Sequence, residues 1–243
     1  MDIIKHLQSH FNNHNHSHNH DNLSNDVCVS LVPIFNHLEE EQLHEIMNLT
    51  KSIKYKKGEV IYRAGYKSDS LYIVSKGKIK IYRLSESGKE QLLHILMPGD
   101  FTGELALFSE TIHESYAEAM EETDVCSVNR GDLQGLLKKY PAISLKILSE
   151  FSKRLEQSEK QTTRFATEKV ETRLAHYLAE LANKDSNVKE VELPMTKKDL
   201  ASYLGTTPET ISRKLFELED AGLIKQKQNK KIEIIDLEEL MSI

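Results

Sequence analysis

The sequence predicts an α+β fold: an N-terminal β-roll of the jelly-roll type, a long helix and a C-terminal winged helix-turn-helix. Glycines recur every 11 or 12 residues from Gly65 to Gly99, among segments that alternate polar and apolar residues, which is typical of short strands. Pro141 then opens a long segment with helical periodicity. Residues 195–225 carry the signals of two short helices joined by a tight turn.

Length and composition indicate a soluble protein of two domains. The chain has 243 residues, of which 39% are hydrophobic and 29% charged, and its formal net charge is −6. It has no run of about 18 apolar residues, so no membrane span is expected. The N-terminus lacks the apolar segment of a signal peptide. Two cysteines are too few for a secreted disulfide framework, which favours a reducing cytoplasm.

Changes in pattern divide the chain into four segments. We expect a flexible tail rich in Asn and His at residues 1–30, the β-roll at 31–139, the long helix at 140–166 and the winged helix-turn-helix at 167–243.

The tail holds six of the eleven histidines. Imidazole suits zinc, copper and nickel, so the tail is a candidate site for zinc, copper or haem. The alternative is a solvated tail whose histidines bind metal only adventitiously, because such tracts are a compositional signal. The candidate ligands are His10, His14, His16, His18 and His20.

The β-roll segment begins with a short helix and continues with a period of two. The helix is expected near residues 39–49, and strands at 58–62, 71–74 and 78–82. Pro98 then begins a turn, and residues 103–106 open a short helix.

The long helix carries a stripe of residues spaced by 3 and 4, like the seam of a coiled coil. We expect this stripe to pair two subunits; the alternative is one amphipathic helix that packs on its own β-roll. The stripe contains Leu148, Phe151, Leu155, Ser158, Thr162 and Phe165. A further helix at 168–181 and a short strand near 188–193 lead into the C-terminal region.

Local signals define the helix-turn-helix. Thr196 and Asp199 form a capping box at the start of the first helix. Gly205 ends that helix, because glycine tolerates a left-handed backbone. Thr207 is a good N-cap, and Pro208 suits the first helical position of the second helix. The apolar face of this helix contains Ile211, Leu215 and Leu218.

The opposite face of the second helix has the chemistry of base recognition. Arg213 can donate two hydrogen bonds to guanine, Glu209 can accept one from cytosine, and Ser212 suits either edge. Pro208 begins this contact region. The candidate phosphate contacts are Thr196, Thr206, Thr207 and Lys214. The alternative is a plain helical hairpin with a solvated polar face.

The residues that follow favour the DNA-binding interpretation. Ile224, Ile232 and Ile234 flank Asn229-Lys230 and predict the two short strands of a wing. Residues 194–231 hold eight Lys or Arg and five Asp or Glu, a charge of plus three in a chain whose total is minus six. A basic region in an acidic protein is what attraction to phosphate requires.

Together these motifs resemble the Crp/Fnr family of bacterial regulators, over about residues 31–235. The resemblance rests on KKGEVIYRAGYKSDSLYIVSKGKIKIYR, LMPGDFTGELALF and the helix-turn-helix, in that order. It implies a cyclic-nucleotide-binding-like β-roll sensor, a dimerisation helix, a DNA reader and RNA polymerase as a further partner. Glu209, Ser212 and Arg213 match the Glu-x-x-Ser-Arg pattern of the Fnr branch, which implies a site similar to TTGAT-N4-ATCAA. Pro208 departs from that pattern.

The resemblance also locates an effector pocket. Gly103, Glu104 and Leu105 match the Gly-Glu-Leu that holds ribose in cyclic-nucleotide members. The Arg-Ser pair that binds the cyclic phosphate in those members is here Glu114-Ser115, and a carboxylate repels a phosphate. We therefore expect a vestigial pocket that does not bind cyclic AMP. A cyclic-nucleotide-dependent regulator remains the alternative.

Two cysteines are too few for an iron–sulfur cluster of the Fnr type. Lactic acid bacterial members of the Fnr branch pair an N-terminal cysteine with one in the β-roll, which implies a reversible disulfide between Cys28 and Cys126. The alternative is two unrelated thiols, with Cys126 a small core residue.

Two other classes of function differ from a DNA-binding regulator. In a metal- or haem-handling protein, the His-rich tail would be the functional part. An enzyme is not expected, because the sequence shows no catalytic residue set and no phosphate-binding loop.

Overall fold

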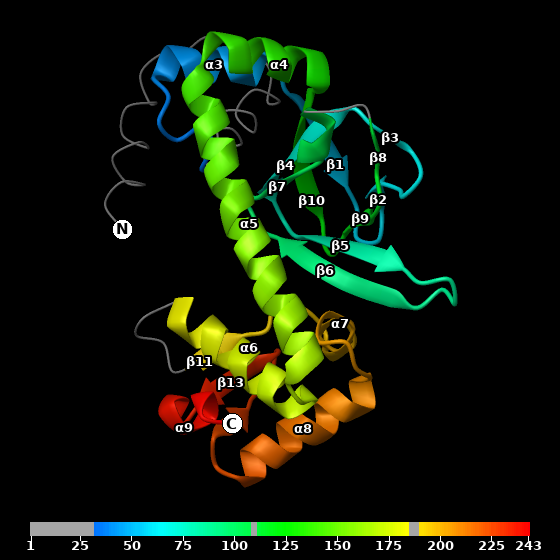
Figure 1. The fold of residues 1–243 in the computed structure, drawn as a ribbon, viewed down its shortest axis with the longest axis vertical. Helices are drawn as coiled ribbons and strands as arrows, with labels where there is room; N and C mark the ends of the chain where they lie inside the picture. The colour runs from blue at the N-terminus through cyan, green and yellow to red at the C-terminus, as the bar shows by residue number, and fades with distance from the viewer. Residues whose placement is uncertain (1–31, 108–110, 185–189) are drawn as a thin grey trace.

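The computed structural model describes residues 32–107, 111–184 and 190–243. The tail histidines proposed as metal ligands, His10 to His20, and Cys28 lie outside the described residues. Figure 1 shows the β-roll at one end, the long helix α5 along the molecule and the smaller C-terminal domain at the other end. No helix in the described part of the chain is both long and apolar enough to span a membrane.

Two four-stranded antiparallel sheets form the β-roll, in the orders β1-β10-β4-β7 and β2-β9-β5-β6. A two-stranded ribbon joins β3 to β8. The strands are β1 (Lys51–Tyr55), β2 (Val60–Tyr62), β3 (Lys67–Ser68), β4 (Ser70–Lys76), β5 (Ile79–Leu84), β6 (Glu90–Leu96), β7 (Phe101–Thr102), β8 (Thr111–Ile112), β9 (Tyr116–Ala119) and β10 (Thr123–Asn129).

The predicted strands are present, with shifted ends. β2 starts at Val60 rather than at Gly58, because Gly58 has a φ of 83° that a strand does not accommodate. The predicted short helix near residues 103–106 is a 3₁₀ turn, η1 (Glu104–Leu107). β1 was missed because its residues are exposed or half-buried, so its sequence lacks an alternating apolar pattern.

Helices close one end of the β-roll. α3 (Glu40–Asn48), α4 (Arg130–Lys139) and the first turns of α5 (Pro141–Thr167) share one core with β4 and β10. In that core Phe35, Leu133, Ile143 and Ile147 are almost fully buried. The β-roll and the start of α5 are therefore one packed unit.

The long helix α5 is 27 residues long, with Pro141 at its N-terminus as predicted. It ends at Thr167, and the extended backbone of the next residue, Glu168, separates it from α6 (Val170–Lys184). On the predicted stripe, Leu148 and Leu155 are exposed, as is Thr162. Phe151 instead packs against the core of its own β-roll. Phe151 therefore fits the alternative of a helix packed on its own β-roll, and the pairing of subunits along the stripe stays a prediction.

The C-terminal domain has its own core, built from α6 and the winged helix-turn-helix. Its sheet has the order β11-β13-β12, and Asn229 and Lys230 form the wing turn with φ of 58° and 62°. The elements are β11 (Glu190–Glu192), α7 (Lys197–Tyr203), α8 (Pro208–Asp220), β12 (Ile224–Gln226), β13 (Lys231–Ile234) and α9 (Leu237–Met241). The predicted pair of wing strands is confirmed.

Candidate DNA-binding site and sensor pocket

Helix α7 begins at the predicted capping box. The Thr196 hydroxyl accepts a hydrogen bond from the N–H of Asp199 at 3.1 Å, and the Asp199 carboxylate accepts one from the N–H of Thr196 at 3.2 Å. Gly205 ends the turn with a φ of 67°. Since the Thr196 hydroxyl already caps α7, a DNA phosphate at this position would have to share that hydroxyl with the cap.

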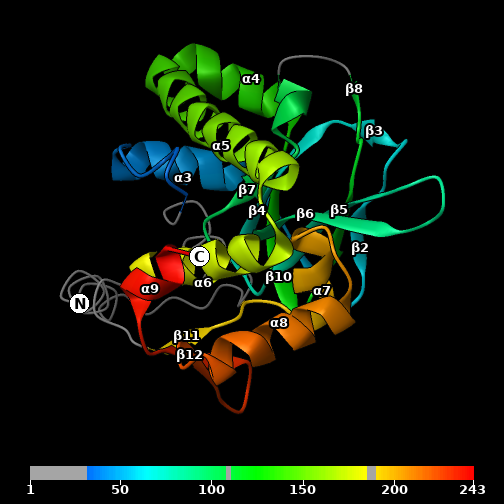
Figure 2. The ribbon, with the colours of Figure 1, turned by 60° about the horizontal axis from the view of Figure 1, so that its bottom comes forward.

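Helix α8 also begins at a side-chain cap, that of Thr207. The Thr207 hydroxyl accepts a hydrogen bond from the N–H of Thr210 at 3.3 Å, and Pro208 occupies the first turn. Ile211, Leu215 and Leu218 are buried in the core of the domain. Figures 1 and 2 both show α8 along the outer edge of the C-terminal domain, away from the sheets of the β-roll.

Of the four residues predicted for base readout, three lie on the exposed face of α8, and the fourth, Pro208, is half-buried in its first turn. Glu209, Ser212 and Arg213 are all exposed, and Arg213 has a side-chain exposure of 66%. The backbone N–H of Glu209 and the hydroxyl of Thr207 hold the pKa of the Glu209 carboxyl below its usual range. Glu209 is therefore an ionised acceptor at neutral pH. Arg213 makes one loose contact, with its Nε 3.7 Å from Glu217 Oε1.

Lys214, a predicted phosphate contact, pairs with two carboxylates of its own chain. Its ammonium lies 2.9 Å from the carboxylate of Glu171 on α6 and also pairs with Glu217. Hydrogen bonds to Glu217 and Glu171 raise the pKa of Lys214. In this structure Lys214 ties α8 to α6, while Thr206 is half-buried and Thr207 exposed at the turn.

Part of the basic charge predicted for this region is neutralised within the wing. Lys227 lies 3.1 Å and Lys231 2.8 Å from the carboxylate of Glu190 on β11. Lys227 also pairs with Glu233 at 2.9 Å. Glu190 and Glu233 lie outside the segment counted from the sequence, which is why that count overstated the free positive charge.

Residues predicted to form the effector pocket contact other residues of the same chain. Gly103 has a φ of 83°, and a Cβ there would overlap the carbonyl oxygen of Ser70. Glu104 Oε1 lies 2.9 Å from the guanidinium of Arg154 on α5. The same guanidinium donates to the carbonyl of Phe101 at 2.8 Å and lies over its ring. Leu105 is exposed.

Comparison with known proteins agrees with both domains. Residues 52–140 match the cyclic nucleotide-binding domain family, and residues 172–243 match the Crp-like helix-turn-helix domain. The probable transcriptional regulator flp of Lacticaseibacillus casei is 36% identical over 216 residues, which cover 88% of this chain and 96% of that protein. The chain belongs to the Crp/Fnr family of DNA-binding transcription regulators. The family consists of regulators rather than enzymes, as the sequence predicted.

Other members of the Crp/Fnr family are similar over most of the chain. The anaerobic regulatory protein of Haemophilus influenzae is 33% identical over 223 residues, covering 90% of this chain and 86% of that protein. The structure of FixK2 from Bradyrhizobium japonicum superposes with a TM-score of 0.71 at 26% identity, covering 79% of this chain and 96% of that one. A CooA mutant from Carboxydothermus hydrogenoformans, at 23% identity and a TM-score of 0.73, covers 87% of this chain and 94% of that one and has the same fold.

The sensor domain of this Crp/Fnr chain contains a buried pair of stacked aromatic rings that the sequence did not predict. The rings of Tyr62 and His113 stack with centroids 3.8 Å apart, and both residues are buried. The Tyr62 hydroxyl lies 2.7 Å from Thr102 Oγ1 and also interacts with Ser115. Burial lowers the pKa of His113, so its ring is neutral at neutral pH. Ser115 thus has a partner within the protein.

Sequence patterns gave little sign of these contacts. Tyr62, His113 and Arg154 come from β2, the segment after β8, and α5, so no local spacing relates them. Glu114, predicted to repel a cyclic phosphate, pairs with Arg83 on the neighbouring strand β5. The carboxylate of Glu114 is exposed, and its ion pair with Arg83 lies at the surface of the β-roll.

Cys126 lies at the centre of β10, between Ser52 of β1 and Ile73 of β4, and is fully buried. It is a disulfide cysteine rather than a free thiol. Its predicted partner, Cys28, lies outside the described residues, so the pairing of the two remains a prediction.

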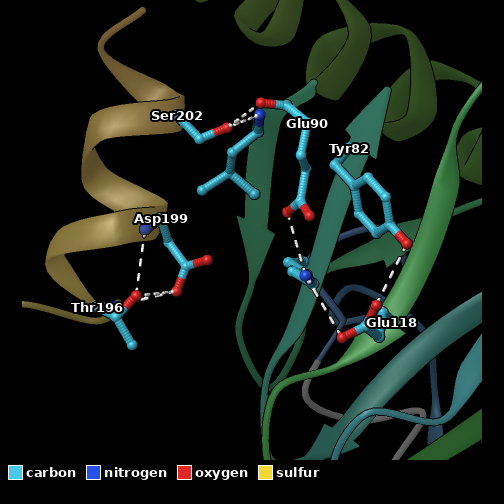
Figure 3. Close-up of polar contacts among 8 residues, drawn as sticks. Tyr82, Glu90, Glu118, Thr196, Asp199 and Ser202 are labelled. Atoms are coloured by element: carbon cyan, nitrogen blue, oxygen red, sulfur yellow. Dashed lines mark hydrogen bonds and ion pairs between the residues drawn. The ribbon is translucent and has the colours of Figure 1, made fainter. Parts of the chain in front are cut away.

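The reader domain of this regulator is docked on its sensor domain. Figure 3 shows Ser202 of α7 against the backbone of β6 at Glu90. The ammonium of Lys80 lies 3.1 Å from the carboxylate of Glu90 and 3.4 Å from that of Glu118. On the other side, the Phe165 ring at the end of α5 lies 3.5 Å from the position that a Cβ of Gly205 would have. Arg173 of α6 donates two hydrogen bonds to the carbonyl of Leu204. The turn of the helix-turn-helix is therefore held from two directions.

Proposed function

We propose that this Crp/Fnr regulator binds a palindromic operator as a homodimer and reads it with Glu209, Ser212 and Arg213. The observation that carries the proposal is the polar row on α8, which is exposed in the described part of the chain and lies opposite the buried face of the helix. Arg213 donates to guanine O6 and N7, Glu209 accepts from cytosine N4, and Ser212 serves a neighbouring edge. The expected site is similar to TTGAT-N4-ATCAA.

The exposed leucines of α5 support the dimer. Leu148 and Leu155 are large apolar side chains in solvent on a 27-residue helix, and Leu145, one turn before Leu148, is also exposed. Pairing two copies along this stripe removes the apolar surface from water. Two-fold symmetry in the protein then requires two-fold symmetry in the operator, with half-sites about one helical turn apart.

The signal that we propose is a thiol–disulfide change at Cys126 with Cys28, rather than a cyclic nucleotide. Two observations support this choice. Cys126 is a disulfide cysteine inside the sensor sheet. Glu104 is bound to Arg154, and Glu114 stands at the sequence position where the resemblance puts the arginine that binds a cyclic phosphate.

Further partners follow from the same function. A cytoplasmic regulator of this kind acts on RNA polymerase. The tail histidines remain candidates for zinc, copper or haem; among the described residues there is no group of three or more His, Cys, Asp or Glu that could hold a metal ion. An iron–sulfur cluster is not proposed, because the chain has two cysteines.

The test is binding of the purified protein to a TTGAT-N4-ATCAA duplex and to a scrambled duplex, reduced and oxidised, at one stated salt concentration. Specific binding that changes with oxidation, and that no longer changes in Cys28→Ser, supports both the reader and the thiol signal. Specific binding that ignores oxidation removes the thiol signal and keeps the reader. Equal binding to both duplexes in both states contradicts the operator assignment.

A further inference from the structure

Phe216 is a large apolar side chain in an unexpected place. It lies in the third turn of α8 and is 65% exposed, more than any other large hydrophobic residue in the described part of the C-terminal domain. The other apolar residues of α8, at positions 211, 215 and 218, are buried. The described residues of the C-terminal domain do not cover this ring, so their packing does not explain a phenyl ring in water at this position.

The helical register puts Phe216 in the row proposed to read bases. An α-helix turns about 100° per residue, so residues seven apart point in nearly the same direction. Phe216 follows Glu209 by seven positions, Ser212 by four and Arg213 by three. All four side chains are exposed, on the side of α8 opposite to its buried face.

The neighbours of Phe216 on that face argue against a docking surface for another protein. Ser212, Arg213 and Asp220 are polar or charged and exposed, and Glu219 is half-buried. A protein interface is expected over a contiguous apolar patch, whereas Phe216 is a single ring among charged groups. The partner that fits has to be polar overall and present one small apolar group.

The major groove of DNA has this chemistry. Its floor presents hydrogen-bond donors and acceptors, and its one apolar group is the C5-methyl of thymine, which phenylalanine contacts in protein–DNA complexes. We propose that Phe216 reads a thymine methyl beside the bases contacted by Arg213 and Ser212, and so adds a fourth specificity-determining residue to α8. This inference rests on the proposed reading of DNA by α8.

Replacing thymine by deoxyuridine tests the contact at the level of one methyl group, because the pairing and the hydrogen-bonding edge stay the same. Each thymine of a TTGAT-N4-ATCAA duplex, its complementary strand and its flanks is replaced in turn. Wild-type protein is expected to lose about fourfold in affinity at one position per half-site, which corresponds to about 0.8 kcal/mol for one buried apolar carbon group. Phe216→Ala is expected to bind the thymine and deoxyuridine duplexes equally at that position.

Two further variants sharpen the result. Phe216→Leu keeps part of the apolar contact and is expected to retain an intermediate preference for thymine. Tyr66→Ala removes an equally exposed aromatic ring (66%) from the β-roll and is expected to leave every thymine-to-uridine ratio unchanged.

Each contrary outcome has a definite meaning. If wild-type protein does not distinguish the operator from a scrambled duplex, the proposed reading of DNA fails. If it does distinguish them, and the same deoxyuridine penalty persists in Phe216→Ala or no penalty appears, the role of Phe216 is overturned. Equal weakening on all duplexes by Phe216→Ala also overturns it, because such a loss indicates a backbone or protein contact.

Discussion

The hydroxyl of Ser202 accepts a hydrogen bond from the backbone N–H of Leu92 at 2.8 Å, although the two residues belong to different domains. The same hydroxyl donates to the carbonyl of Glu90 at 2.7 Å. β6 is an edge strand, so helix α7 satisfies backbone groups that a further strand would otherwise pair. The fully buried Leu92 side chain belongs to the core of the reader domain.

Ser202→Ala is expected to destabilise the folded protein by about 1–3 kcal/mol, because it leaves two half-buried backbone groups without partners. The measurement is denaturant unfolding. Ser212→Ala is the matched control, since Ser212 is exposed on α8, and is expected to leave the free energy of unfolding unchanged. Equal stability of Ser202→Ala and the wild type would show that water replaces the contact.

Arg213→Ala is expected to cost about 1–3 kcal/mol of operator affinity and to relax the choice of base at one guanine. Affinities for the operator and for duplexes changed at that guanine measure both effects. A loss of the same size on every sequence would assign Arg213 to the phosphate backbone instead.

Lys214→Ala is expected to act on stability before DNA binding. Its ammonium joins α8 to Glu171 of α6, and a surface ion pair contributes up to about 1 kcal/mol. Thermal unfolding of Lys214→Ala and of Glu171→Gln should show similar small losses. If the DNA affinity of Lys214→Ala, but not of Glu171→Gln, depends less strongly on salt concentration, the predicted phosphate contact of Lys214 is supported.

Leu155→Glu is expected to convert the proposed dimer to a monomer with a folded β-roll, because it places a charge on the exposed stripe of α5. Analytical ultracentrifugation gives the oligomeric state, and circular dichroism shows whether the fold persists. Lys153→Glu also adds a carboxylate to α5 and serves as the control. A Leu155→Glu protein that remains dimeric would place the subunit interface elsewhere.

The stability of the β-roll is expected to fall as the pH falls below about 6.5. Burial lowers the pKa of His113, so the unfolded chain takes up a proton that the folded chain resists. Its stabilising contribution is full above the ordinary histidine pKa and is lost on acidification. Unfolding free energies at pH 7.5 and 5.5 measure the loss.

His113→Phe keeps an aromatic ring against Tyr62 and removes the titrating group, so it is expected to reduce this pH dependence. The same replacement at the exposed His37 is the control and should not change it. An unchanged pH dependence in His113→Phe would show that another group is responsible.

The helix-turn-helix could be predicted nearly to the residue because its signals are local. Thr196, Gly205, Thr207 and Pro208 each determine the backbone of their own turn, and each does so in the structure. The exposed polar row of α8 followed from helical spacing alone.

Contacts between distant segments had no such signal. Ser202 meets residues about 110 positions earlier in the chain, and Arg154 meets a glutamate 50 positions earlier. Lys214 has the spacing of a residue beside the base-reading row, yet Glu171 on another helix turns it inward. Hydrophobic spacing also predicted Phe151 at the subunit interface, whereas it packs against the core of its own β-roll. A helical period shows that a side chain is apolar on one face, but it does not say whether the β-roll or a second subunit covers that face.

The contact between Phe165 and the turn at Gly205 also has an optical consequence. The chain contains no tryptophan. An indole placed by Phe165→Trp would be the only one in the protein, at the point where the long helix meets the reader. Its emission would report, without an added dye, any tilt of the reader against α5 when an operator or an oxidant is added.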